Sequence, residues 1–263
     1  MNFETLALEV DRRGVARLDL ALPEKRNALS ARMIAELSGA ANAIGKDEAV
    51  RAVVLSAQGK TFCAGGDLAW MQAQIAADRE TRMREARKLA MALLALNTMP
   101  KPLIGRVQGD AFGGGVGMMC VCDVVIAARE AKFGLTETRL GLIPATIGPY
   151  VIARLGEGMA RRVFMSGRVF DASEAQALGL VAEIADDAGL DEAVERQVRP
   201  YLSTAPGAVG AAKALARFLG PRIDDAVIDE TIRRLADSWE TSEASEGIAA
   251  FFDKRPAPWA AKK

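Results

Sequence analysis

The sequence contains no histidine and only three cysteines. Without an imidazole the chain cannot hold a Ser-His-Asp triad, a Cys-His pair or a histidine-ligated metal ion. Proton transfer near neutral pH must therefore use another group, and a carboxylate whose pKa is raised by burial is the natural choice. The odd cysteine count, with Cys120 and Cys122 one residue apart, does not fit a disulfide framework. We expect no metal site.

Net charge and long apolar runs are absent as well. The 34 lysines and arginines balance the 34 aspartates and glutamates, so no overall field attracts nucleic acid or an anionic membrane. No apolar run approaches the roughly 18 residues of a membrane span, and the first residues lack the pattern of a signal peptide. We therefore expect a cytoplasmic protein with no nucleic-acid and no membrane partner. Half of the 263 residues are hydrophobic, which is ample for a large core.

Short apolar runs alternate with turns and helical patterns through most of the chain. Strands are predicted at residues 15–20, 50–55, 103–107, 124–127 and 180–184. Ser30 predicts the N-cap of a helix, and a long helical stretch should end before Pro100. From about residue 145 the pattern is mostly helical. These patterns predict an α/β core over residues 1–199, followed by a C-terminal helical region over residues 200–263.

Two segments repeat the order strand, glycine-rich turn, helix. The turns are residues 62–67, Phe-Cys-Ala-Gly-Gly-Asp, and residues 109–115, which end in three glycines. Free N–H groups at a helix start favour negative charge, so two such turns could aim two donors at one oxygen and form an oxyanion hole. The alternative is that these glycines only allow tight turns and close packing. The second turn has neither the dinucleotide fingerprint nor the lysine of a phosphate loop.

Together these segments resemble the crotonase superfamily, which is the enoyl-CoA hydratase/isomerase family. The resemblance covers nearly the whole chain and is carried by residues 23–30, 62–68, 109–117, 122–123 and 133–144. It implies a spiral of repeated ββα units with a C-terminal helical region that builds a homotrimer, often stacked as a dimer of trimers. It also implies an acyl-CoA substrate and no cofactor, because CoA is part of the substrate.

The resemblance also implies roles for single residues. It gives the two oxyanion N–H groups to Gly66 and Gly114, and the acid–base role to Glu137, which would otherwise be a solvated surface carboxylate. Asp67 is implied to line the thioester and pantetheine end of the substrate, with capping of the following helix as the alternative. Tyr150 is expected to point into the acyl pocket. The other positions implied to bind substrate are Lys25, Arg26, Ala28, Ala64, Leu68, Gly117 and Lys254, the last in a basic pair with Arg255.

One position departs from the family pattern. Standard hydratases are expected to carry a second glutamate three residues after the oxyanion glycine of the second turn, where this chain has Gly117. Three interpretations stay open. The chain could be a double-bond isomerase that uses Glu137 alone, or a hydratase for a branched or carboxylated acyl chain that gains room beside Gly117. It could also be a catalytically inactive protein that binds acyl-CoA.

A narrower resemblance favours the hydratase. Residues 62–71, 113–117 and 141–150 are similar to methylglutaconyl-CoA hydratases of leucine breakdown and their isoprenoid-pathway relatives. We therefore predict a hydro-lyase that adds water to an α,β-unsaturated thioester such as 3-methylglutaconyl-CoA, with the isomerase as the alternative. A substrate carboxylate would need a cation, and the arginines on the helix after the first turn are Arg82, Arg84 and Arg87.

Overall fold

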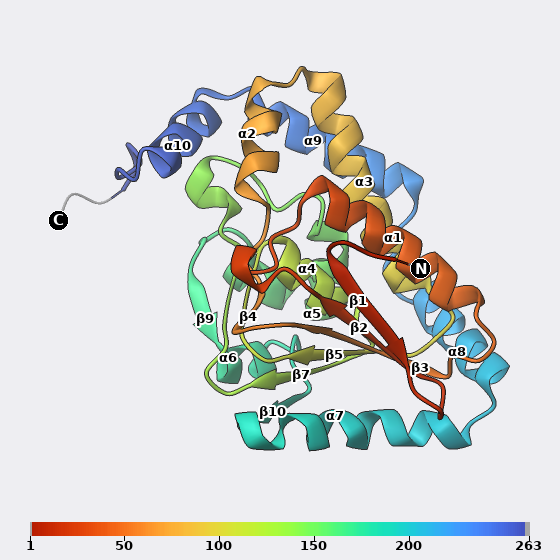
Figure 1. Cartoon of the computed structure of the whole chain (residues 1–263). Coiled ribbons are helices and arrows are strands. Elements are labelled where there is room, and N and C mark those ends of the chain that lie inside the picture. Colours follow the sequence, from red (N-terminus) through yellow and green to blue (C-terminus); the bar gives the residue numbers. More distant parts are fainter. Residues whose placement is uncertain (1, 261–263) are drawn as a thin grey trace.

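Two β-sheets form the centre of the structure, a computed structural model that describes residues 2–260 (Figure 1). The larger sheet has the strand order β1-β2-β3-β5-β7-β10, in which β1 is antiparallel to β2 and all other neighbours are parallel. Its strands are β1 (Leu6–Val10), β2 (Val15–Leu20), β3 (Ala52–Ala57), β5 (Leu103–Val107), β7 (Val124–Ala128) and β10 (Glu183–Ala185).

The smaller sheet has the order β4-β6-β8-β9 and consists of three-residue strands. These are β4 (Thr61–Cys63), β6 (Asp110–Phe112), β8 (Lys132–Gly134) and β9 (Val169–Asp171). The first three are parallel neighbours, and β9 runs antiparallel to β8. The segments that leave β4, β6 and β8 therefore start at the same edge of the sheet.

Helices surround both sheets and confirm the mixed α/β class. They are α1 (Ala31–Lys46), α2 (Leu68–Ala76), α3 (Arg79–Thr98), α4 (Gly114–Val121), α5 (Gly148–Phe164), α6 (Ala172–Ala177), α7 (Leu190–Val198), α8 (Pro206–Leu219), α9 (Asp225–Trp239) and α10 (Ser242–Phe252). Short 3-10 helices are η1 (Pro23–Lys25), η2 (Glu137–Leu140), η3 (Asp187–Gly189) and η4 (Arg199–Ser203). All of the secondary-structure elements described after residue 199 are helices.

Apolar patterning explains the larger sheet and its first helix. All six residues of β3 are buried, which is typical of a parallel strand covered on both faces. The predicted strands at 15–20 and 103–107 are confirmed as β2 and β5, whereas β3 begins two residues later than predicted. The predicted cap is confirmed, because the Ser30 hydroxyl accepts a hydrogen bond from the N–H of Met33 at 3.2 Å.

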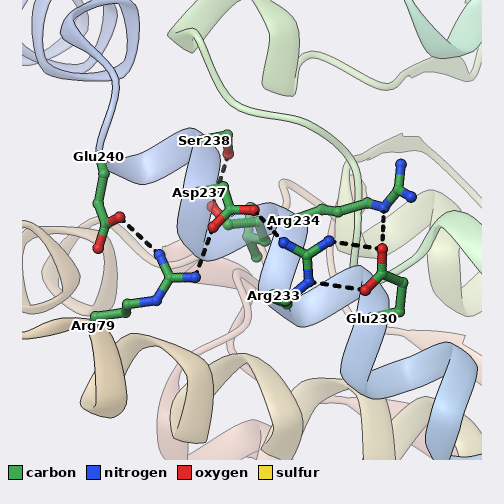
Figure 2. A network of polar contacts seen from close by, with 8 residues as sticks. Arg79, Glu230, Arg233, Arg234, Asp237, Ser238 and Glu240 are labelled. Atoms are coloured by element: carbon green, nitrogen blue, oxygen red, sulfur yellow. Dashed lines mark hydrogen bonds and ion pairs between the residues drawn. The ribbon is translucent and has the colours of Figure 1, made fainter.

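Helix α9 lies along α3 and joins the C-terminal region to the core (Figure 1). Ala86 and Ala90 of α3 pack against Ile228 and Ile232 of α9 in a separate apolar cluster. A polar network continues this contact at the start of α3, where Arg79 forms ion pairs of 2.7 Å with Asp237 and Glu240 (Figure 2). These exposed pairs add little stability individually, so the apolar cluster carries most of the attachment.

Within residues 2–260, no helix combines the length and the apolar character needed to cross a membrane.

Candidate active site

The two glycine turns meet at one edge of the smaller sheet. Strands β4 and β6 pair in parallel, with Cys63 beside Ala111, so the turns that follow them leave the sheet side by side. A Cβ built on Gly113 would lie 4.0 Å from the Cα of Gly65, and one built on Gly65 would lie 3.3 Å from the carbonyl oxygen of Phe112. The absence of side chains here allows the two backbones to touch.

Both turns expose backbone donors at this contact. Gly113 has φ 49° and ψ −114°, a conformation that glycine tolerates, and its own N–H donates to the carbonyl of Gly134 at 2.9 Å. The next residue, Gly114, begins α4, where helix geometry leaves the first N–H groups without an internal acceptor. Among the described residues, the N–H groups of Gly114 and Gly66 donate to no acceptor.

Leu29 contacts both turns and connects them. Its N–H donates to the carbonyl of Gly65 at 2.8 Å, and its own carbonyl accepts from the N–H of Asp67 at 3.2 Å. These bonds make Leu29 and Gly66 partners in an isolated parallel bridge, which leaves the N–H of Gly66 pointing away from it. On the other side, a Cβ on Gly114 would collide with Leu29 Cδ1. Leu29 therefore packs against both donor residues, a contact that the sequence did not predict.

The segment before Leu29 runs beside the first turn. The carbonyl of Arg26 accepts a hydrogen bond from the N–H of Ala64 at 3.0 Å, so the structure brings these two predicted substrate-binding positions together. Ala28 and Ala64 are half-buried, while Lys25 and Arg26 expose their charges to solvent. Positive side chains at the rim and small ones inside would suit a ligand with an anionic end.

Asn27 fixes the shape of this segment. Its backbone is left-handed, with φ 52°, which asparagine adopts more readily than most residues. Its buried side-chain oxygen accepts from the N–H of Leu22, and its amide donates to the carbonyls of Gln58 and Thr61, each at 2.9 Å. These three bonds tie the segment to the start of β4 and thereby position the first turn.

Glu137 comes from the third neighbouring strand of the same sheet edge. It begins η2, shortly after β8, and a Cβ built on Gly113 would lie 3.0 Å from its Oε1. Its Oε2 is buried and has no hydrogen-bond partner among the described residues. Burial raises the pKa of Glu137 from 4.5 to about 7, against a weaker opposing effect of a bond from its own N–H. The carboxylate is thus close to half protonated at neutral pH.

Gly117 lies one turn along α4 from Gly113, and its N–H donates to the Gly113 carbonyl at 3.0 Å. Gly113 has non-helical dihedral angles, so position 117 does not share its direction and has neighbours of its own. A Cβ there would collide with Cγ2 of Ile147 and lie 3.6 Å from Cδ1 of Leu93. The expectation that Gly117 leaves room beside it is therefore wrong, because Ile147 fills that space.

Three other predicted site residues have structural contacts of their own. Tyr150 is buried, and its hydroxyl donates to the carbonyl of Ala90 at 3.1 Å, so this hydroxyl is engaged with α3. Asp67 caps α2, because its side chain accepts from the N–H of Trp70 at 3.0 Å. Lys254 is exposed and follows α10, a helix that lies at the outer edge of the molecule and away from α4 (Figure 1). Leu68 is exposed at the start of α2.

The α3 arginines are engaged elsewhere. Arg82 donates to the carbonyl of Gln74 at 2.8 Å, at the end of α2, and its guanidinium lies over the ring of Trp239. Arg87 pairs with α9 through Asp225 and its neighbour Asp229. Arg84 is exposed and donates a hydrogen bond to Thr81 of its own helix. These contacts attach α3 to α2 and α9 and supply no cation to Glu137.

The cysteines and carboxylates do not form a metal site within residues 2–260, where no group of three or more ligand-type side chains converges. All three cysteines are free and buried, and burial raises the pKa of Cys63 to about 12. Cys63 is therefore a thiol at neutral pH and a poor nucleophile.

A cavity of about 1030 Å³ lies elsewhere, between α8 and the end of α4 opposite the glycine turns. Its lining includes Cys120, Asp123 and Lys213, and the last two form an ion pair of 2.8 Å. The converging donors and the carboxylate with the raised pKa lie at the other end of α4. We therefore take the edge of the smaller sheet as the candidate active site.

Comparison with known proteins gives a consistent result. The sequence model of a family described as enoyl-CoA hydratase/isomerase matches residues 11–262. The chain is 34% identical to the crotonyl-CoA hydratase of Syntrophomonas wolfei over 100% of both chains. It is 31% identical to the mitochondrial methylglutaconyl-CoA hydratase of Mus musculus, over 95% of this chain and 80% of that one. A crystal structure of an enoyl-CoA hydratase from Shewanella pealeana has a TM-score of 0.81 and 37% identity, over 98% of this chain and 97% of that chain.

Proposed function

Because the chain belongs to the enoyl-CoA hydratase/isomerase family and is a hydro-lyase of the enoyl-CoA hydratase type, we propose that it adds water across the double bond of a 2-enoyl-CoA thioester at the edge of its smaller sheet. The observation that carries the proposal is the meeting of three groups there. Within residues 2–260, the N–H groups of Gly66 and Gly114 donate no hydrogen bond, and the Glu137 carboxylate lies beside Gly113.

The two N–H groups would bind the thioester carbonyl. Attack of water on C3 moves electron density through C2 onto the carbonyl oxygen, which becomes an enolate. Donors that are already oriented stabilise this charge without reorganising, and they do so more strongly than water does. The free N–H of Gly114 at the start of α4 adds the favourable end of the helix dipole.

Glu137 would move the proton. Its ionised form takes a proton from water as the oxygen bonds to C3, and the protonated form then delivers that proton to C2. One carboxylate can perform both transfers, because the proton that it accepts is the proton that it returns. A pKa of about 7 suits this role, since the group gains and loses a proton at similar cost near neutral pH.

Double-bond isomerisation is the second candidate, and the packing at Gly117 favours it. Residue 117 is a glycine and brings no second carboxylate, and Ile147 fills the space where its Cβ would lie. An isomerase needs only one base, which removes a proton from one carbon of a 3-enoyl-CoA and returns it to another. The enolate formed on the way would use the same two N–H donors.

An experiment in heavy water separates these functions. The purified protein is incubated with 2-enoyl-CoA and 3-enoyl-CoA, and the products are read by mass spectrometry. We expect the 2-enoyl ester to gain one D₂O at a rate proportional to the enzyme concentration. Migration of the double bond with deuterium incorporation but no added water would instead establish the isomerase. Tight binding with neither change would leave the chain as a binding protein.

We also propose that the acyl-CoA partner lies along the segment from Lys25 to Ala28. Its exposed cations would meet the nucleotide phosphates, while Ala64 and Leu68 would line the pantetheine and thioester end. Lys254 follows α10, which lies away from α4, and this placement suits contact with the CoA of a neighbouring subunit. No cofactor is required, since CoA is part of the substrate.

We propose that the region from residue 200 onward builds a homotrimer, and the exposed apolar surface of α8 supports this assembly. This helix has no buried residue, and its exposed apolar side chains include Leu215, Leu219 and Phe218, which is 83% exposed. Such a surface is typical of a covered interface. Light scattering on the purified protein should give the mass of three or six chains, and Phe218→Ser should lower it. The matched control Met165→Ser, another exposed apolar residue, should not. A monomeric wild-type protein would refute the assembly.

A further inference from the structure

Helix α2 supports the first oxyanion donor from one side. The helix begins directly after the first glycine turn, and a Cβ built on Gly66 would lie 3.5 Å from Cγ of Met71 and 3.8 Å from Cε3 of Trp70. The Asp67 carboxylate connects the same turn to the helix, because it accepts a hydrogen bond from the N–H of Trp70 at 3.0 Å. A displacement of α2 would therefore displace Gly66 and its N–H.

Helix α2 has little packing of its own. Of the nine residues described in this helix, only Gln74 is buried, and Leu68 and Ile75 are 53% and 44% exposed. The helix is attached by Arg82 of α3, which donates to the carbonyls of Gln74 and Ile75 in the last turn, at 2.8 and 3.0 Å. A guanidinium at this end also meets the negative end of the helix dipole. Arg82 thus fixes the end of α2.

Trp239 of α9 in turn contacts Arg82. The guanidinium carbon lies 5.3 Å from the centroid of the Trp239 ring, which is within the range of a cation–π contact. A small cavity of about 20 Å³ lies at this junction, and its lining includes Trp70, Gln74, Arg82 and Trp239. Helices α2, α3 and α9 therefore meet around these side chains, and one of them, Trp70, contacts Gly66.

The other contacts of Trp239 lead to the segment that carries Glu137. Trp239 packs against a buried apolar cluster formed by Leu142, Ala244 and Ile248. Leu142 follows η2, and its N–H donates to the carbonyl of Glu137 at 3.1 Å. The packing of Trp239 on this cluster is therefore connected to the backbone of the acid–base residue by one hydrogen bond.

Helix α10 supports the same segment through two glycines. A Cβ on Gly247 would lie 2.6 Å from the carbonyl carbon of Leu140, and one on Gly141 would collide with the backbone of Glu243. The backbones of η2 and α10 thus touch, because no side chain separates them. Leu140 also packs against the cluster that Trp239 contacts. Helices α9 and α10 therefore support η2 together.

We propose that Trp239 is a positioning residue that sets both the Gly66 donor and the Glu137 carboxylate. It acts on the donor through Arg82 and α2, and on the carboxylate through Leu142 and η2. This inference rests on the proposed hydration of a 2-enoyl-CoA. The donor and the carboxylate must face one bound thioester at the same time, and a misplacement of about 1 Å can lower the rate on the order of a hundredfold.

Hydration kinetics test the two connections separately. Arg82→Met removes the bonds to α2 and leaves η2 supported, so it should lower kcat for crotonyl-CoA by about tenfold and change KM by less than about twofold. Trp239→Ala releases both connections and should lower kcat by about a hundredfold. Trp239→Phe keeps a ring beside the guanidinium and an apolar side chain beside Leu142, so its kcat should stay within about threefold of the wild type.

The matched control is Arg87→Met on the same helix. Arg87 also attaches α3 to α9, through Asp225 and Asp229, and among the described residues it makes no bond to α2. Arg87→Met should lower the melting temperature about as much as Arg82→Met does and leave kcat unchanged. An equal loss of kcat in the two methionine variants would overturn the inference, because the attachment of α3 to α9 would then explain both. Wild-type kcat in a folded Trp239→Ala protein would also overturn it.

Hydrogen exchange on the substrate-free protein tests the same connections without turnover. Peptides covering residues 66–76 and 137–142 should both exchange faster in Trp239→Ala, only the first should do so in Arg82→Met, and neither in Arg87→Met. Unchanged exchange of both peptides in Trp239→Ala would overturn the inference even in an active hydratase. A wild-type protein that turns over no enoyl-CoA would refute the proposed function, while exchange would still decide the role of Trp239, so the two failures are distinguishable.

Discussion

Replacing Glu137 with glutamine is expected to lower kcat/KM for a 2-enoyl-CoA by a factor of about 10²–10⁴ and, above pH 7, to stabilise the fold. Glutamine keeps the shape of the side chain but can neither take a proton from water nor return it to carbon. The loss should appear mainly in kcat, because the thioester is held by the N–H groups of Gly66 and Gly114. A Glu137→Gln variant with near wild-type turnover would exclude the proton-transfer role.

The pH dependence follows from the raised pKa. The ionised form of Glu137 is the one that activates water, so kcat/KM of the wild type should rise with pH and level off above about 7. The chain has no histidine, and burial raises the pKa of the neighbouring Cys63 thiol to about 12, so neither adds a second limb near neutral pH. A profile with one rising limb is expected for the wild type, and a flat, low profile for Glu137→Gln.

Glu137→Gln should stabilise the fold because it removes the cost of burying a charged carboxylate. The folded state holds the Glu137 proton up to a pKa of about 7, whereas the unfolded chain releases it near 4.5. Stability therefore falls as pH rises from 4.5 through 7, and the full cost is present above 7. Glutamine carries no charge to bury, so the variant should unfold at higher temperature at pH 8 and at the same temperature below pH 4.5.

The matched control is Glu157→Gln on the exposed surface of α5, where the glutamate lies 3.6 Å from Arg161 in a long ion pair. This change should alter neither turnover nor the pH dependence of unfolding. A stability gain in Glu157→Gln equal to that in Glu137→Gln would show that the effect comes from net charge and not from burial.

The larger sheet was predictable because its strands are recognisable on their own. The runs in β2, β3, β5 and β7 are long enough, and rich enough in Val, Ile and Leu, to show burial without knowledge of their partners. The edge strand β1 was missed, because its burial falls from the buried Leu6 to the exposed Val10 and shows no alternation. Tertiary pairing with β2 decides its state.

The smaller sheet was not predicted, and the site depends on it. Three-residue strands such as β4, β6 and β8 are too short to show a period, so only their pairing identifies them. That pairing brings the two glycine turns and Glu137 to one edge. The sequence suggested two N–H donors and a carboxylate, and the family resemblance assigned them to residues, but their convergence comes from contacts between segments far apart in the chain.

Ile147 illustrates a second limit. It lies 30 positions after Gly117, and an apolar residue in an apolar stretch gives no local sign that it fills the space beside a distant glycine. The sequence shows that residue 117 has no side chain. Only the structure shows that Ile147, at the start of α5, fills the space beside it.

Deleting the N–H of Gly114 is expected to lower kcat by a factor of about 10²–10³, the usual effect of losing one oxyanion donor. Proline is the direct test, because it lacks the N–H and is well tolerated at the first position of a helix. A simple Gly114→Pro variant is ambiguous, however. Any Cβ at this position collides with Leu29, so a loss of activity could come from displacement of the first turn.

A matched pair removes the ambiguity. In a Leu29→Ala background the colliding atom is absent, and Gly114→Ala and Gly114→Pro both add a Cβ at the same place, but only proline removes the donor. We expect the proline variant to fall below the alanine variant in kcat by about 10²–10³, with KM changed much less, because the enolate needs this donor more than the ground-state carbonyl does. Equal kcat values in two folded proteins would mean that the oxygen is stabilised elsewhere. The oxyanion hole at the meeting of the two turns would then be rejected even if Glu137 proved essential.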